Sequence, residues 1–115
     1  MTAVPAPATA VAHLGLGLDA GGTQTRWALA GSGGGLRGEG HVASISGLQL
    51  DDAAGREAVA AALHDIAAAI APLGGAARVV AGITGFEATQ APLLCRLVVA
   101  ALGVPSAAVQ AMTDI

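Results

Sequence analysis

Two short apolar runs near the start of the chain, separated by a pair of glycines, predict the two strands of a hairpin. The first run covers residues 13–20 ("HLGLGLDA") and the second covers residues 24–30 ("QTRWALA"). Gly21 and Gly22 lie in the connection "AGGT", and because glycine adopts positive φ at no steric cost, we expect a tight turn there. A second turn, "GSGGG", then leads into a third predicted strand at 36–45.

The next segment has the periodicity of an amphipathic helix. Its large apolar residues recur at spacings of four, three and four positions: Val59, Leu63, Ile66 and Ile70. Asp51 and Asp52 offer an N-cap and a favourable charge at the start of this helix. Its end is predicted near Pro72 and the pair Gly74 and Gly75.

The rest of the chain predicts a strand, a helix and a last strand. The β-branched run at 77–85 ("ARVVAGITG") is typical of a buried strand. Pro92 suits the first turn of a helix, and Gly103 suits its end. The apolar residues of that helix are Leu94, Leu97, Val98 and Ala101. Residues 107–115 ("AAVQAMTDI") predict the fifth strand.

The predicted order of elements is therefore β-β-β-α-β-α-β, which is the order of a ribonuclease-H-like lobe. Three antiparallel strands followed by helical crossovers predict an α/β fold, with a mixed five-stranded sheet and helices on its faces. We expect residues 1–12 to form a flexible tail and residues 13–115 to form the lobe. Groups placed at strand ends need further chain to close a pocket, so we expect a lobe truncated before that closing segment.

Composition and charge exclude several classes of function. The chain has 115 residues, a net charge of -3 and 11% charged residues, so it lacks the basic surface that nucleic-acid binding requires. Although 54% of residues are hydrophobic, Pro, Gly, Arg or Gln interrupts every apolar stretch before it could span a membrane. Pro5 and Pro7 interrupt any signal-peptide core. The single cysteine, Cys95, fits a reducing cytoplasm, where we expect the protein to act.

Three stretches resemble one protein family. The stretch "LGLDAGGTQTRWAL" resembles the first phosphate-binding motif of the sugar kinase, Hsp70 and actin superfamily, and within it that of the amino-sugar kinases and the BadF/BadG/BcrA/BcrD-type ATPases. The stretch "VVAGITGFE" resembles the strand end that borders the sugar pocket of these kinases, and "AMTDI" resembles the strand that carries their catalytic aspartate. The resemblance runs from Leu14 to the last residue and covers about the first third of a family member.

The resemblance implies an actin-like ATPase lobe that binds ATP and Mg²⁺. Glycines let a backbone approach a phosphate closely, so Gly21, Gly22 and Thr23 would present N–H groups and a hydroxyl to the nucleotide. Asp19 would hold the metal, through water. A glycine turn between two strands is also common in β proteins generally, so the bend alone does not decide between these interpretations.

The resemblance also assigns a base and a sugar pocket. Asp114 would bind the sugar and take the proton from its attacking hydroxyl. Ser44, Thr84 and Gly85 would line the pocket. This chain has Ser44 where its relatives typically carry asparagine, which leaves the identity of the sugar open, and Ala20 where glycine is more usual; alanine fits there if its φ is negative.

Three functions are compatible with these residues. The first is an amino-sugar kinase that phosphorylates a hydroxyl of glucosamine or N-acetylglucosamine, a reaction of amino-sugar metabolism. The second is a BadF/BadG-type ATPase that activates an iron-sulfur dehydratase or reductase. The third is an inactive fragment of either protein, because no second phosphate loop follows Asp114. We expect a homodimer, or a lobe that packs against a C-terminal lobe, with no nucleic acid and no membrane as partner.

Overall fold

The computed structural model describes residues 14–113 of the chain. The tail expected over residues 1–12 and the predicted base Asp114 lie outside these residues.

The first three strands form an antiparallel meander, as the sequence predicts. They are β1 (Gly15–Ala20), β2 (Gln24–Ala30) and β3 (Leu36–Ala43). In the turn between β2 and β3, Gly34 adopts φ 87°. That conformation is in the left-handed region, which is open to glycine but strained for other residues.

Two helices and two strands follow. Helix α2 (Ala53–Ile70) is followed by β4 (Arg78–Ile83), α3 (Ala91–Leu102) and β5 (Val109–Thr113). Short 3₁₀ turns precede or follow these elements at η1 (Gly47–Asp51), η2 (Ala71–Leu73), η3 (Ala88–Gln90) and η4 (Ser106–Ala108).

The helix ends have the chemistry that the sequence predicts. At the start of α2, the Asp52 carboxylate accepts a hydrogen bond from the Gly55 N–H at 2.7 Å. This bond satisfies one of the N–H groups that have no partner inside the helix. Gly74 ends the 3₁₀ turn after α2 at φ 113°, and Gly103 ends α3 at φ 73°. Both glycines therefore act as left-handed caps.

The cap at Asp52 gives a measurable effect on stability. We expect Asp52→Ala to lower the free energy of unfolding by about 1 kcal/mol, the usual loss when an N-cap side chain is removed. Urea denaturation followed by circular dichroism measures the change. Asp65→Ala is the matched control, because Asp65 is also exposed but lies inside α2. Equal stability of the Asp52 and Asp65 variants would contradict the assignment of the cap.

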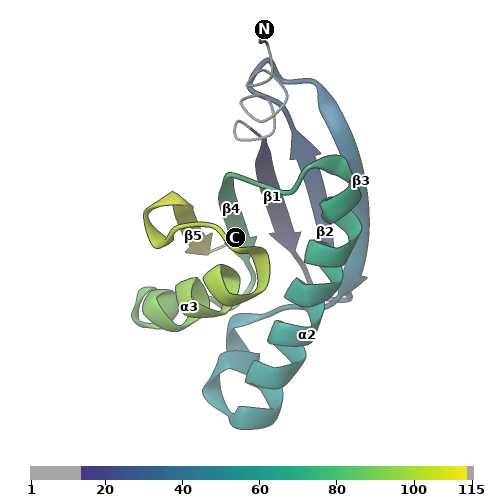
Figure 1. Cartoon of the computed structure of the whole chain (residues 1–115). Coiled ribbons are helices and arrows are strands. Elements are labelled where there is room, and N and C mark those ends of the chain that lie inside the picture. Colours follow the sequence, from purple (N-terminus) through teal and green to yellow (C-terminus); the bar gives the residue numbers. More distant parts are fainter. Residues whose placement is uncertain (1–13, 114–115) are drawn as a thin grey trace, which may run out of the picture.

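The five strands form one mixed sheet in the order β3-β2-β1-β4-β5. Strands β1, β4 and β5 are parallel, and β2 is antiparallel to its neighbours β1 and β3. The predicted α/β fold class and element order are confirmed. Figure 1 shows α2 beside β2 and β3 and α3 beside β5, both on the same side of the sheet.

The two helices therefore cover one face of the sheet in residues 14–113. The physical reason is the direction of the crossovers. The connections β3-α2-β4 and β4-α3-β5 both advance the same way across the sheet. Right-handed crossovers that advance in one direction place their helices on one side.

The hydrophobic core lies between the sheet and these helices. Trp27 belongs to it, and only 7% of its surface is exposed. Its ring lies against β3, where a Cβ atom at Gly40 would come within 2.9 Å of the indole Nε1. The buried residues of the helices are Val59, Ala62, Leu63, Ile66, Ile70, Leu94 and Val98.

The other face of the sheet carries small and charged side chains. Two apolar residues on that face are partly exposed, Val80 on β4 at 41% and Met112 on β5 at 42%. No helix within residues 14–113 has the length and hydropathy needed to cross a bilayer.

Candidate functional site

Three loops meet at one end of the sheet. They follow β1, β3 and β4, which all run in the same direction. Ala20 at the end of β1 is in register with Ile83 at the end of β4, which is in register with Thr113 of β5. Ligands of open α/β sheets bind at the carboxyl ends of parallel strands, so this end is the candidate site.

The bend between β1 and β2 has two backbone N–H groups free for a ligand. Gly21 donates its N–H to the Gln24 carbonyl at 3.2 Å, so this group closes the hairpin. The N–H groups of Gly22 and Thr23 have no acceptor among the described residues. Of the three N–H groups that the sequence assigned to a phosphate, two are therefore available.

The glycines of the bend are not required by the backbone conformation. Neither Gly21 nor Gly22 has a positive φ, so the conformational reason that the sequence suggested for them is wrong. A Cβ atom at Gly22 would meet nothing within 4 Å, and one at Gly21 would lie 3.9 Å from the Gln24 oxygen. The chain itself therefore leaves the space beside Gly22 open.

Ser44 ties the bend to the end of β3. Its hydroxyl oxygen lies 3.2 Å from the Gly21 carbonyl oxygen and 3.2 Å from the Gly22 carbonyl oxygen. Ser44 is half-buried, directly after the last residue of β3. The residue predicted to contact a sugar thus contacts the predicted phosphate loop.

Thr25 fixes the backbone directly after Ser44 by a buried hydrogen bond. Its side chain is fully buried, and its hydroxyl oxygen accepts a hydrogen bond from the Ile45 N–H at 3.0 Å. Thr25 lies on β2, next to the bend, and Ile45 follows Ser44. The position of Ser44 over the bend is therefore fixed by a buried hydrogen bond.

Thr84 and Gly85, which the resemblance assigns to the sugar pocket, lie beside the end of β1 that leads into the bend. Thr84 donates its N–H to the Ala20 carbonyl at 3.1 Å, and its carbonyl accepts from the Gly47 N–H at 2.9 Å. Both residues are exposed, and Gly85 has φ 72°. Because its backbone groups are paired, Thr84 has only its hydroxyl left for a ligand.

Ala20, where the family more often has glycine, fits the strand. It is 1% exposed, and every non-glycine residue described has a negative φ. The alanine is therefore compatible with the backbone at this position.

Two further residues make contacts at this end of the sheet that the sequence did not predict, Gly47 and Gln90. The Gln90 side-chain amide donates to the Gly47 carbonyl at 2.7 Å and accepts from the Glu87 N–H at 2.9 Å. These contacts join the loop after β3 to the loop after β4. The spacing of Ser46 and Gln49, a capping-box pattern, was the available signal for the turn that carries Gly47.

Asp19 lies at the end of β1 on the face without helices. Its exposed side chain borders a depression of about 420 Å³, together with Arg26, Glu39 and Val80. No group of three or more metal-ligating side chains occurs in residues 14–113. Magnesium commonly takes one or two carboxylates and fills its other positions with water and phosphate oxygens, so Asp19 fits that chemistry.

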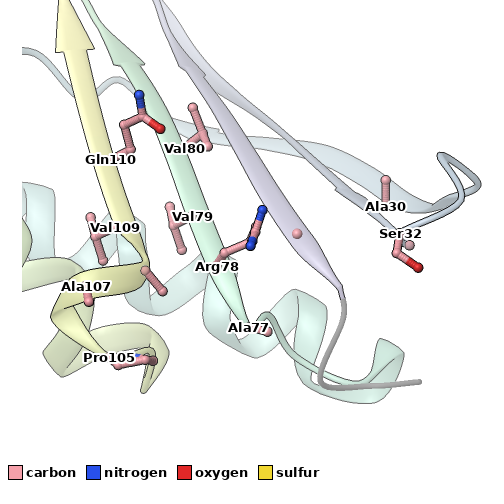
Figure 2. Close-up of a pocket in the computed structure, with 13 residues that line it drawn as sticks. Ala30, Ser32, Ala77, Arg78, Val79, Val80, Pro105, Ala107, Val109 and Gln110 are labelled. Atoms are coloured by element: carbon pink, nitrogen blue, oxygen red, sulfur yellow. The ribbon is translucent and has the colours of Figure 1, made fainter. Parts of the chain in front are cut away.

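A larger pocket of about 820 Å³ lies at the opposite end of the sheet. Figure 2 shows Arg78 and Gln110 on β4 and β5 at its border, with Ser32 in the β2–β3 turn. None of the predicted site residues lines it. This pocket and the predicted chemistry therefore lie at different places.

Comparison with known proteins identifies the fold. No protein-family model and no curated protein matches the chain. The chain is similar to the crystal structure of the "Putative N-acetylglucosamine Kinase" from Chromobacterium violaceum, with a TM-score of 0.55 and 24% sequence identity. The match covers 89% of this chain and 35% of that one. The likeness shows that the two proteins share a fold over the matched region. In this chain, the bend at Gly22 and Thr23 follows the first strand of that fold.

Proposed function

We propose that the chain is the N-terminal lobe of an ATP-dependent amino-sugar kinase, which transfers the γ-phosphoryl group of ATP to a hydroxyl of glucosamine or N-acetylglucosamine. The observation that carries this proposal is the pair of unpaired N–H groups at Gly22 and Thr23, beside open space at Gly22. Successive backbone N–H groups in a turn form a typical anion site. The likeness to a structure named as an N-acetylglucosamine kinase supports the choice of reaction.

The residues of the bend have separate roles in this proposal. The N–H groups of Gly22 and Thr23 hold phosphate oxygens, and Asp19 holds Mg²⁺ through water. The metal, when bound, neutralises charge on the phosphates during transfer. Fixed N–H donors contribute without reorganising, because the hairpin that carries them is already closed by the bond from Gly21 to Gln24.

The neighbouring loops are assigned to the sugar. The exposed hydroxyl of Thr84 and the backbone at Gly85 lie next to the bend through the bond from Thr84 to Ala20. A sugar bound there lies close to the phosphate that it receives, and such proximity is a large part of phosphoryl transfer. Asp114, which follows Thr113 of β5 in the sequence, is the proposed base.

A titration of the ¹⁵N-labelled chain tests the nucleotide site. Mg-ATP is expected to shift the amide resonances of Gly22 and Thr23, whereas AMP, which lacks the β- and γ-phosphates, leaves them in place. N-acetylglucosamine is expected to shift the resonances of Thr84 and Gly85. The absence of any shift at the bend with millimolar Mg-ATP would refute the proposal.

A turnover assay addresses the 115-residue chain by itself. We expect negligible phosphorylation of glucosamine or N-acetylglucosamine, because the described residues supply phosphate donors from a single bend and cannot exclude water from the reaction. A coupled assay of ADP release, with and without sugar, measures the rate. Robust sugar-dependent turnover by the purified chain would contradict this expectation.

A further inference from the structure

The orientation of the bend depends on where its carbonyl groups point. A peptide group is planar and trans, so the carbonyl of one residue and the N–H of the next point in opposite directions. The carbonyls of Gly21 and Gly22 both point towards the Ser44 hydroxyl. The N–H groups of Gly22 and Thr23 therefore point away from Ser44, towards the side open to a ligand.

Glycine makes this orientation easy to lose. Turning the peptide between Gly21 and Gly22 changes only dihedral angles of glycine, which tolerates both signs of φ. A turned peptide would direct its carbonyl outwards, where it repels a phosphate oxygen. The Gly22 N–H makes no bond in the described residues that would oppose such a turn.

Ser44 supplies the restraint that the glycines lack. Its oxygen is 3.2 Å from each of the two carbonyl oxygens, and its own position is fixed by the buried bond between Ile45 and Thr25. A serine hydroxyl has one proton, which the two carbonyls share, and its lone pairs stay available as acceptors. Ser44 therefore has no second donor for a sugar hydroxyl.

We propose that Ser44 is a positioning residue for the phosphate loop, which holds the N–H groups of Gly22 and Thr23 in the ligand-facing orientation. This inference rests on the proposed function as far as phosphate binding is concerned. It differs from the sugar contact that the family resemblance assigns to this position. The hydroxyl acts on the nucleotide through the backbone of the bend, without touching it.

The first experiment needs no ligand. Backbone ¹⁵N relaxation of the wild-type chain should give order parameters at Gly22 and Thr23 near the rigid value of about 0.85, and Ser44→Ala should lower them towards about 0.6. Ser44→Thr, which keeps the hydroxyl, should restore the wild-type values. Ser32→Ala is the control, because Ser32 is an exposed serine in the other hairpin turn. Unchanged order parameters in Ser44→Ala would overturn the inference.

The second experiment measures the affinity for magnesium pyrophosphate by the shift of the Gly22 and Thr23 resonances. Loss of one restraining hydrogen bond is expected to weaken binding about fivefold in Ser44→Ala, with the Ser44→Thr and Ser32→Ala variants within about twofold of wild type. Weaker binding with unchanged order parameters would indicate a direct contact and would overturn the positioning role. If the wild-type chain binds no pyrophosphate, the proposed function fails, while the relaxation experiment still tests Ser44.

Discussion

Replacing Gly47 with alanine is expected to lower the free energy of unfolding by about 3 kcal/mol, at the upper end of the usual cost of overpacking. The alanine Cβ would lie 2.0 Å from the carbonyl oxygen of Gly85 and 2.7 Å from the Cα of Phe86. These are backbone atoms, which cannot rotate away as a flexible side chain would. One of the two loops must therefore move.

Movement of either loop breaks further contacts. Gly47 donates its N–H to Thr84 at 2.9 Å and accepts from the Gln90 side chain at 2.7 Å. Separating the loops removes these bonds, and it also displaces Thr84 from the Ala20 carbonyl at the end of β1. The substitution is therefore expected to disturb the candidate site as well as stability.

Urea denaturation of Gly47→Ala and of the control Gly33→Ala measures the effect. A Cβ atom at Gly33 would meet nothing within 4 Å, and Gly33 has no positive φ. Its replacement is expected to change stability by less than about 0.5 kcal/mol, as at most surface positions. If Gly47→Ala is as stable as Gly33→Ala, the close contact between the two loops is wrong.

The second large effect is expected on binding and not on stability. Gly22→Ala should fold with nearly wild-type stability, because its Cβ meets no atom of the chain and the backbone has no positive φ. The new methyl group would occupy the space through which a phosphate approaches the N–H groups. Hydrogen bonds to charged groups contribute about 1.5–3 kcal/mol. Loss of one such bond lowers the affinity for Mg-ATP about tenfold or more.

Calorimetric titration with Mg-ATP and thermal denaturation of the same samples measure the two quantities. Gly33→Ala again serves as the control, since it adds the same methyl group to a glycine-rich turn at the other end of the sheet. If Gly22→Ala binds Mg-ATP with wild-type affinity, the assignment of the bend to the nucleotide site is wrong. A large loss of stability would show that this glycine serves the fold.

The sequence predicted the elements of the fold well because their signals are local. Glycine and proline lie between the apolar runs, and the cap at Asp52 and the turns at Gly74 and Gly103 involve residues close in sequence. These features depend on short-range chemistry that can be read along the chain.

The contacts of the candidate site could not be predicted in the same way. Ser44 meets the bend across 23 positions of sequence, and Gln90 meets Gly47 across 43. Their partners are set by the register of the strands and by the packing of two loops, which no periodicity encodes. For the same reason, the sequence suggested a positive φ for the glycines of the bend, whereas neither Gly21 nor Gly22 has one.

Trp27 also provides a built-in optical reporter. The chain has one tryptophan and no tyrosine, so its fluorescence under ultraviolet excitation comes from a single side chain. That side chain is 7% exposed and lies against Gly40 on the helix-covered side of the sheet. Its emission therefore follows the packing of the three antiparallel strands, four positions after the end of the bend at Thr23, without a dye or an introduced label.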